Sequence, residues 1–154
     1  MGIADRTTQG FKLSNHKRNY GLFNLPPADL DFTIGKSKEI DDWYYAQTKP
    51  GSWKVHFNTD SDYMGNATLT VAFAGSAKNP KLEVSVNDHL VGTLYMGNDA
   101  SVYRSAVLSG YYQKEEIKFP ANLLRKGNNT ISLHLPNVKP GGGIMYDAIK
   151  LEVN

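Results

Sequence analysis

Apolar and polar residues alternate with a period of two along several short stretches of the chain, and helical periodicity is nearly absent. In the clearest stretch, Trp53, Val55 and Phe57 share one parity, while Lys54 and His56 take the other. The same alternation recurs at 68–73, 82–87, 131–135 and 149–153. Strands with this pattern bury one face and expose the other, as the strands of antiparallel sheets do.

Turn-forming residues separate these stretches. The sequence Asn87-Asp88-His89 has the side-chain chemistry of a hairpin turn, and it predicts a return strand at 91–95. A single helical turn is expected at 121–125, after Pro120. Short strands at roughly ten-residue spacing, with glycine-rich turns between them, predict one all-β domain: a mainly antiparallel β-sandwich or jelly roll.

Asp147 interrupts the alternation, because it falls on the same parity as Ile149 and Leu151. A carboxylate on the core side of a strand must be hydrogen-bonded, paired or bound to a metal. One interpretation is a β-bulge at the start of the strand, which turns the side chain outward. The other is a structural role for the carboxylate. A calcium ion is one candidate for that role, since calcium takes carboxylate and carbonyl oxygens as ligands.

The composition of the chain excludes several kinds of site. Its 154 residues suit a single domain, and the lack of cysteine rules out disulfides, zinc–thiolate sites and cysteine nucleophiles. The four histidines show no metal-site spacing, and no serine-hydrolase or phosphate-loop motif is present. A formal net charge of +2 gives little support for a nucleic-acid partner, and no apolar run is long enough to span a membrane.

The N-terminal residues lack the hydrophobic stretch of a signal peptide. Either the protein is intracellular or the chain is a mature fragment of a secreted or periplasmic protein, and we favour the second interpretation. Residues 1–30 are interpreted as a lead-in or inter-domain segment, and residues 31–154 as the β-sandwich domain.

Aromatic residues are the most informative side chains for function. The chain has nine tyrosines, and two adjacent pairs stand out: Tyr44-Tyr45, which follows Trp43, and Tyr111-Tyr112. Such rings offer an apolar face that can stack on a sugar ring, together with a polar edge. Because adjacent strand residues point to opposite faces, one tyrosine of each pair is expected inside the domain and the other outside.

The order of several segments resembles the C-terminal domain of rhamnogalacturonan lyases of polysaccharide lyase family 4. The segments that carry the resemblance include IGKS at 34–37, DWYYAQ at 42–47, WKVHF at 53–57, ATLTVAFAG at 67–75, LEVSVN at 82–87 and MYDAIKLE at 145–152. Further matching segments lie at 18–23, 104–111 and 124–131. This ordered set covers nearly the whole chain and is far more specific than any single motif.

The resemblance implies a galactose-binding-like β-sandwich, a jelly roll that is classed as a carbohydrate-binding module. In these lyases the catalytic lysine and histidine belong to a separate domain, so the resemblance assigns no catalytic residue to this chain. Galactose-binding-like domains often hold a structural calcium ion near the last strand, which favours Asp147 as a metal ligand.

The leading hypothesis is a non-catalytic module that binds pectin, in particular the galacturonate-containing backbone of rhamnogalacturonan I. The candidates for stacking on sugar faces are aromatic: Trp43, one of Tyr44 and Tyr45, and one of Tyr111 and Tyr112. The candidates for polar contacts are Arg104, which would take the uronate carboxylate, and, as lesser candidates, Lys114 and Asn87. An alternative role for Arg104 is structural, tying a loop to Asp99 or to a backbone carbonyl.

Two other functions stay open. The first is a scaffold domain that packs on the catalytic domain of the parent lyase without binding sugar, which would cover the apolar segment 22–27 and the glycine loop 141–143. The second is a small lyase in its own right, because tyrosine, arginine and lysine can serve in β-elimination. The expected partners are a polysaccharide and the catalytic domain, with no nucleic acid, no membrane and no cofactor apart from the calcium ion.

Overall fold

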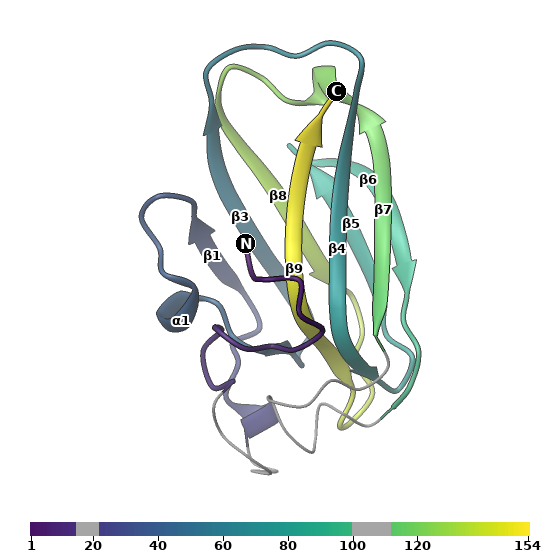
Figure 1. Cartoon of the computed structure of the whole chain (residues 1–154). Coiled ribbons are helices and arrows are strands. Elements are labelled where there is room, and N and C mark those ends of the chain that lie inside the picture. The colour runs from purple at the N-terminus through teal and green to yellow at the C-terminus, as the bar shows by residue number, and fades with distance from the viewer. Residues whose placement is uncertain (15–21, 100–111) are drawn as a thin grey trace.

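The computed structural model describes residues 1–14, 22–99 and 112–154, and these form a sandwich of two β-sheets (Figure 1). The five-stranded sheet has the order β1-β3-β8-β5-β6, with β1 at Leu30–Thr33, β3 at Gly51–Thr59, β8 at Gly127–Leu135, β5 at Lys81–Val86 and β6 at His89–Tyr95. The four-stranded sheet has the order β2-β9-β4-β7, with β2 at Ala46–Gln47, β9 at Gly143–Val153, β4 at Asn66–Ala77 and β7 at Gln113–Pro120. Three short helical turns accompany them: η1 at Leu22–Asn24, α1 at Glu39–Asp42 and η2 at Ala121–Leu123.

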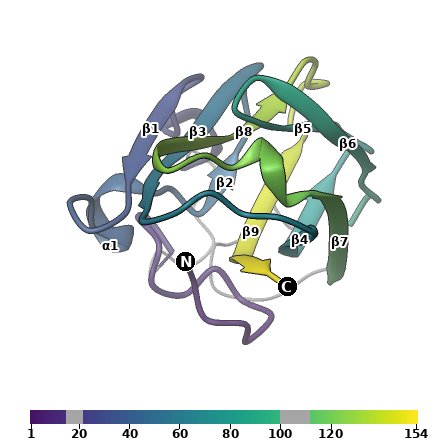
Figure 2. The same cartoon turned by 90° about the horizontal axis from the view of Figure 1, so that it is seen from above.

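The two sheets lie face to face as separate layers when the domain is seen from above (Figure 2). Neighbouring strands within the described residues pair antiparallel, except β1, which runs parallel to β3. The predicted all-β sandwich with mainly antiparallel strands is therefore confirmed. None of the helices in the part of the chain described here is long and apolar enough to cross a membrane.

The alternating stretches of the sequence coincide with β3, β4, β5, β8 and β9. The predicted hairpin is also confirmed, because β5 and β6 are joined at Asn87 and Asp88, whose φ angles of 47° and 68° are those of a tight hairpin turn. The helical turn expected at 121–125 is present as the 3₁₀ turn η2. Period-two patterning therefore located the strands that bury one face in the core.

Large aromatic rings fill the core at one end of the sandwich. The ring of Trp43 meets that of Trp53 edge-on at 5.0 Å between centroids, and Trp53 stacks on Tyr146 at 5.7 Å. The hydroxyl of Tyr146 donates a 2.6 Å hydrogen bond to the Oε1 atom of Gln47, while Gln47 Nε2 donates to the Leu133 carbonyl at 3.2 Å. These buried polar groups are thus paired inside an otherwise apolar core.

The N-terminal segment lies across β9 and closes part of the sandwich (Figure 1). The Met1 amino group donates to the Ile149 carbonyl at 2.9 Å, and the Ile149 amide donates to the Met1 carbonyl at 2.8 Å. Gly2 forms an antiparallel bridge with Ala148, and the Phe11 side chain is fully buried. The domain boundary expected at residue 31 stays a prediction, but residues well before it contribute to the core.

Candidate functional site

Two of the predicted sugar-stacking residues lie in the core instead. Trp43 is 0% exposed and Tyr45 is 1% exposed, and burial raises the pKa of Tyr45 to about 12. A ring enclosed on all sides by other side chains cannot stack on a sugar, so the prediction was wrong for Trp43, and Tyr45 is the tyrosine of its pair that packs inside the domain. The reason is that the 42–47 segment inserts its largest rings between the sheets, where they bury the most apolar surface.

The other predicted aromatic residues have mixed outcomes. Tyr44 is half-buried, as expected for the partner of a buried Tyr45, and the Lys12 ammonium lies 5.0 Å from the centre of its ring. Tyr112 is also half-buried, with the Arg6 guanidinium 5.0 Å from its ring centre. Arg104 and Tyr111 lie outside the described residues.

Tyr112 and Lys114 share a shallow depression of about 430 Å³ on the outer face of the four-stranded sheet, next to the N-terminal residues. The Lys114 ammonium lies 3.6 Å from a Glu116 carboxylate oxygen, and the neighbouring Lys150 pairs with Glu152 at 2.8 Å. The positive charges of this depression are therefore already balanced by acidic partners.

Asp147 lies in a β-bulge of β9, which confirms that interpretation of the sequence. Ala72 pairs with Ala148 and Phe73 pairs with Tyr146, so Asp147 is an extra residue in β9. Its side chain is nevertheless only 1% exposed, because the N-terminal segment covers it. One carboxylate oxygen accepts the Asp5 amide and the other accepts the Arg6 amide, both at 3.2 Å.

Burial raises the pKa of Asp147, and the two backbone amides oppose that shift. The neighbouring Asp5 carboxylate raises the pKa further. Amide N–H donors on both oxygens supply the partial positive charge that a cation would otherwise provide, so this donor set does not fit a calcium ion well. In the described ranges, no group of three or more acidic or histidine side chains is placed to hold a metal. The calcium assignment stays a prediction, and the geometry gives Asp147 another structural role.

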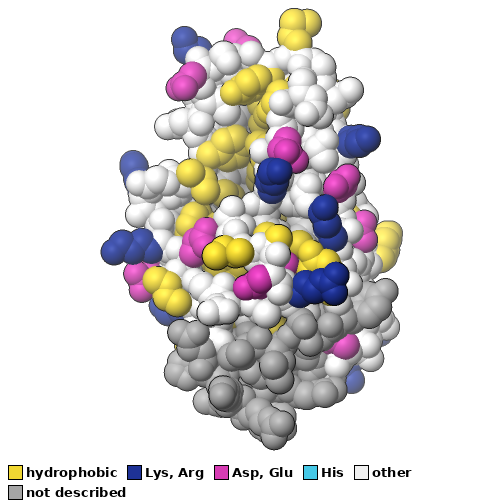
Figure 3. Space-filling view, viewed as in Figure 1, with side chains coloured by type: hydrophobic (Ala, Val, Ile, Leu, Met, Phe, Trp, Pro, Cys, Tyr) yellow, Lys and Arg dark blue, Asp and Glu magenta, His cyan; other side chains and the backbone are white. Residues whose placement is uncertain are grey.

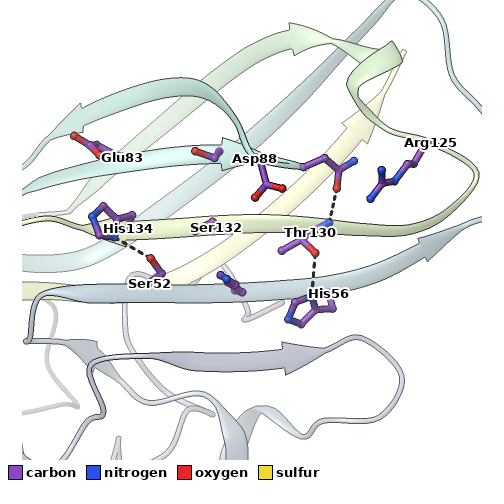
Figure 4. A pocket seen from close by; sticks show the side chains of 11 residues that line it. Ser52, His56, Glu83, Asp88, Arg125, Thr130, Ser132 and His134 are labelled. Atoms are coloured by element: carbon purple, nitrogen blue, oxygen red, sulfur yellow. Dashed lines mark hydrogen bonds between the residues drawn. The ribbon is translucent and has the colours of Figure 1, made fainter.

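A polar groove of about 360 Å³ lies on the outer face of the five-stranded sheet (Figure 4). Every described residue that lines it is polar or charged: Ser52, Lys54, His56, Glu83, Ser85, Asn87, Asp88, Arg125, Thr130, Ser132 and His134. We call this surface the polar groove. The signal for it in the sequence is the polar parity of three strands, which includes His56 and His134, but that pattern does not show that the three strands are neighbours.

The register of β3, β8 and β5 sets these side chains in rows across the sheet. Ser52, His134 and Glu83 are aligned in one row, and Lys54, Ser132 and Ser85 are aligned in the next. Rows on one face of a sheet repeat every two residues, about 7 Å apart along the strands. The groove therefore presents hydrogen-bonding groups at regular intervals over three strands.

Hydrogen bonds hold the histidines of the polar groove in place. His134 Nδ1 lies 2.8 Å from the Ser52 hydroxyl, and His56 Nδ1 lies 3.0 Å from the Thr130 hydroxyl (Figure 4). On its other side, His56 Nε2 lies 2.6 Å from an Asp31 carboxylate oxygen. The rings are thus fixed by their neighbours on three strands.

Asn87 lies at the end of the polar groove, where its side chain is largely engaged. Its amide nitrogen donates at 2.8 Å both to the Leu123 carbonyl and to Asn129 Oδ1, while its amide oxygen accepts the Thr130 amide at 2.8 Å. Both amide protons are therefore used, and only one oxygen lone pair is left for a ligand. Asn87 mainly positions the hairpin turn.

The two cations of the polar groove are available to a ligand. In the part of the chain that the structure describes, neither Lys54 nor Arg125 forms an ion pair, and Arg125 Nε only donates to the Asn128 carbonyl at 3.2 Å. Of the acidic residues in the groove, Glu83 is paired with Lys81 at 3.1 Å. An anionic group can therefore approach Lys54 or Arg125 without displacing an acidic partner.

Comparisons with known proteins show the family of this chain. Residues 1–151 match the family model described as "CBM-like: Polysaccharide lyase family 4, domain III", and the chain belongs to this family of carbohydrate-binding-module-like domains. It is 43% identical to the rhamnogalacturonate lyase of Dickeya dadantii over 98% of its own length and 27% of that protein. It is also 30% identical to "Probable rhamnogalacturonate lyase B" of Aspergillus flavus, over 82% of this chain and 26% of that protein. The chain thus spans about a quarter of the length of these curated relatives.

A solved structure is also similar. It is a family 35 carbohydrate-binding module from an environmental isolate, with 20% identity and a TM-score of 0.47, and the match covers 78% of this chain and 76% of that one.

Proposed function

We propose that this domain is the non-catalytic carbohydrate-binding module of a rhamnogalacturonate lyase, and that it binds the galacturonate-containing chains of pectin, with rhamnogalacturonan I as the main ligand. The single observation that carries the proposal is the polar groove, where the charges of Lys54 and Arg125 are not used by the fold. Family membership supports the carbohydrate as the class of ligand. The parent lyase would be secreted, with its catalytic residues outside this chain.

The chemistry of the polar groove suits an acidic oligosaccharide. Serine, threonine and histidine side chains can exchange hydrogen bonds with sugar hydroxyls, and Lys54 or Arg125 can donate charge-assisted hydrogen bonds to a uronate carboxylate. The groove is open, and no tyrosine, tryptophan or phenylalanine is among its described lining residues, so the affinity is expected in the millimolar to micromolar range, about −4 to −8 kcal/mol.

Calorimetric titration with unbranched rhamnogalacturonan I oligosaccharides tests the proposal. Lys54→Ala and Arg125→Ala should each weaken binding by about tenfold to a hundredfold, since a hydrogen bond to a charged group contributes about 1.5–3 kcal/mol. Lys118→Ala is the matched control, because Lys118 is exposed on β7 in the opposite sheet and should leave the affinity unchanged.

Two further results would decide the ligand class. Added salt should weaken binding, because the contacts of the groove with the carboxylate are exposed to solvent. A folded wild-type domain that gives no heat at millimolar oligosaccharide would overturn the proposal. Equal affinity for a neutral galactan would overturn the part that assigns the ligand as acidic.

A scaffold role is the second candidate function, and a specific observation favours it. An apolar groove of about 480 Å³ lies at one side of the sandwich, between the edges of the two sheets. Exposed apolar surface of this kind is typical of surfaces that bind another protein segment. The two functions use different faces of the domain, so they are compatible.

A further inference from the structure

The strand β9 has a free edge over its last residues. Ile149 directs its amide and carbonyl toward Met1, away from β4. Because these directions alternate along an antiparallel strand, Leu151 and Val153 direct their amides and carbonyls toward the same edge. No described residue pairs with β9 there, since β2 pairs only with Ile144 and Met145 and the N-terminal bridge ends at Ala148.

The apolar groove lies directly beside this free edge. Its apolar lining comes from the two sheets and from the residue after η2: Val55, Phe57, Ile131, Leu151 and Val153, together with Leu124. Figure 3 shows hydrophobic side chains gathered in a strip along this side of the domain, near β9 and β3. Leu151 and Val153 continue the inward-facing parity of Ile149, yet they are only half-buried, and Ile34 at the rim is 51% exposed. The sandwich is therefore open where the edge of the sheet is free.

We propose that a strand of a rhamnogalacturonate lyase polypeptide adds to this edge, antiparallel to β9, and closes the sandwich with its own apolar side chains. The direction of the added strand follows from the existing bridge. Since Gly2 lies opposite Ala148, Met1 lies opposite Ile149, and a residue joined to the Met1 nitrogen by a peptide bond would lie opposite Lys150. The next three residues outward would pair with Leu151, Glu152 and Val153. This interaction rests on family membership and the edge geometry, and it is independent of the glycan ligand.

A strand continuous with Met1 fits this edge better than a second copy of the chain. The free edge is four residues long, about 13 Å, so a separate molecule would gain few hydrogen bonds for the entropy lost on association. A covalently connected strand avoids most of that loss, because its effective concentration is high. A second copy would also pair through its own β9. The inward side chains of that strand already face the apolar groove of their own molecule, so they could not fill the groove of the first molecule.

Four-residue fusions ahead of Met1 test the register. The sequence Val-Thr-Val-Thr would place both valines opposite Leu151 and Val153, facing the groove, whereas Thr-Val-Thr-Val has the same composition and turns them to the outer face. The first fusion should raise the melting temperature by about 3 °C or more and slow hydrogen exchange at the Leu151 and Val153 amides roughly tenfold. The second should change neither quantity.

The Dickeya dadantii lyase provides the natural comparison. Hydrogen exchange at the amides aligned with Leu151 and Val153 should be slow in the intact enzyme and faster in the excised segment that matches this chain. Equal exchange in the two forms, or equal effects of the two fusions, would overturn the proposal. Concentration-dependent protection of these amides in the unfused chain would overturn it in favour of pairing between two copies.

Discussion

The carboxylate of Asp147 connects the two ends of the described sequence. It receives the amides of Asp5 and Arg6, while the bulge in β9 directs it to the outer face of the sheet, under the N-terminal segment. A residue that looks misplaced in a strand pattern is thus an acceptor for backbone donors far away in the sequence. The bulge explains the broken alternation, and burial explains the raised pKa, which the two backbone amides oppose.

Replacing this carboxylate should loosen the N-terminal segment. Asp147→Ala leaves two partly buried amides without an acceptor, which should cost about 1–3 kcal/mol of folding free energy. The melting temperature should fall by about 2–4 °C for each kcal/mol. Glu152→Ala on the same strand is the control: its pair with Lys150 is exposed, and its loss should cost under about 0.5 kcal/mol. Equal thermal shifts for the two variants would contradict the anchoring role.

At the scale of elements, two glycines lie at opposite ends of the pairing between β3 and β8. Gly51 is opposite Leu135, and Gly127 is opposite Thr59. Gly51 has φ of +155°, and a Cβ atom there would lie 2.1 Å from the Ala28 carbonyl oxygen. Gly127 has φ of +93° and no atom within 4 Å of the position of a Cβ. Of these two positions, only Gly51 lacks room for a side chain, because the backbone at Ala28, just before β1, passes close to it.

Alanine substitutions at Gly51 and Gly127 distinguish the cost of a steric clash from the cost of a strained backbone conformation. Gly127→Ala should cost about 1–2 kcal/mol, the usual cost of a left-handed conformation for a residue with a side chain. Gly51→Ala should cost about 2 kcal/mol more, because the chain around Ala28 must also move. Urea unfolding of the two variants measures the difference, and an equal loss of stability in both would contradict it.

At the scale of the whole molecule, the sequence predicted the strands better than the site. The alternation of Leu82, Val84 and Val86 reflects one buried face, which is a local property and was sufficient to predict a strand. The parallel pairing of β1 depends on the strand order within its sheet, and the burial of Trp43 depends on how the two sheets meet; no local pattern contains either.

The polar groove shows the same limit. Its side chains come from three strands that are far apart in the sequence, such as Lys54 in β3 and Ser132 in β8, and only the strand order brings them together. Trp43 and Tyr45 are aromatic but buried, and the sequence alone does not show whether such a ring packs between the sheets or lies on the surface.

The buried tyrosines should make the whole domain sensitive to alkali. Burial raises the pKa of Tyr45 from 10.0 to about 12, and it raises that of Tyr146 as well. The folded state therefore keeps protons that the unfolded state loses above pH 10, so stability should fall as the pH rises from about 10 through 12.

Tyr45→Phe provides the test of this alkaline effect. It removes one ionisable group, so the loss of stability between pH 10 and 12 should be less steep by up to roughly 1.4 kcal/mol per pH unit. Urea unfolding at several pH values measures the slope, and an unchanged slope in the variant would contradict the prediction.

The position of β9 also has a consequence for the order of folding during synthesis. This strand follows all the others in the sequence, yet it lies between β2 and β4 and pairs with β4 over most of its length. The four-stranded sheet cannot assemble before residues 143–153 have left the ribosome. Until then, part of the inward faces of β4 and of the five-stranded sheet lacks its partner strand, so the nascent chain is expected to expose apolar surface that favours aggregation.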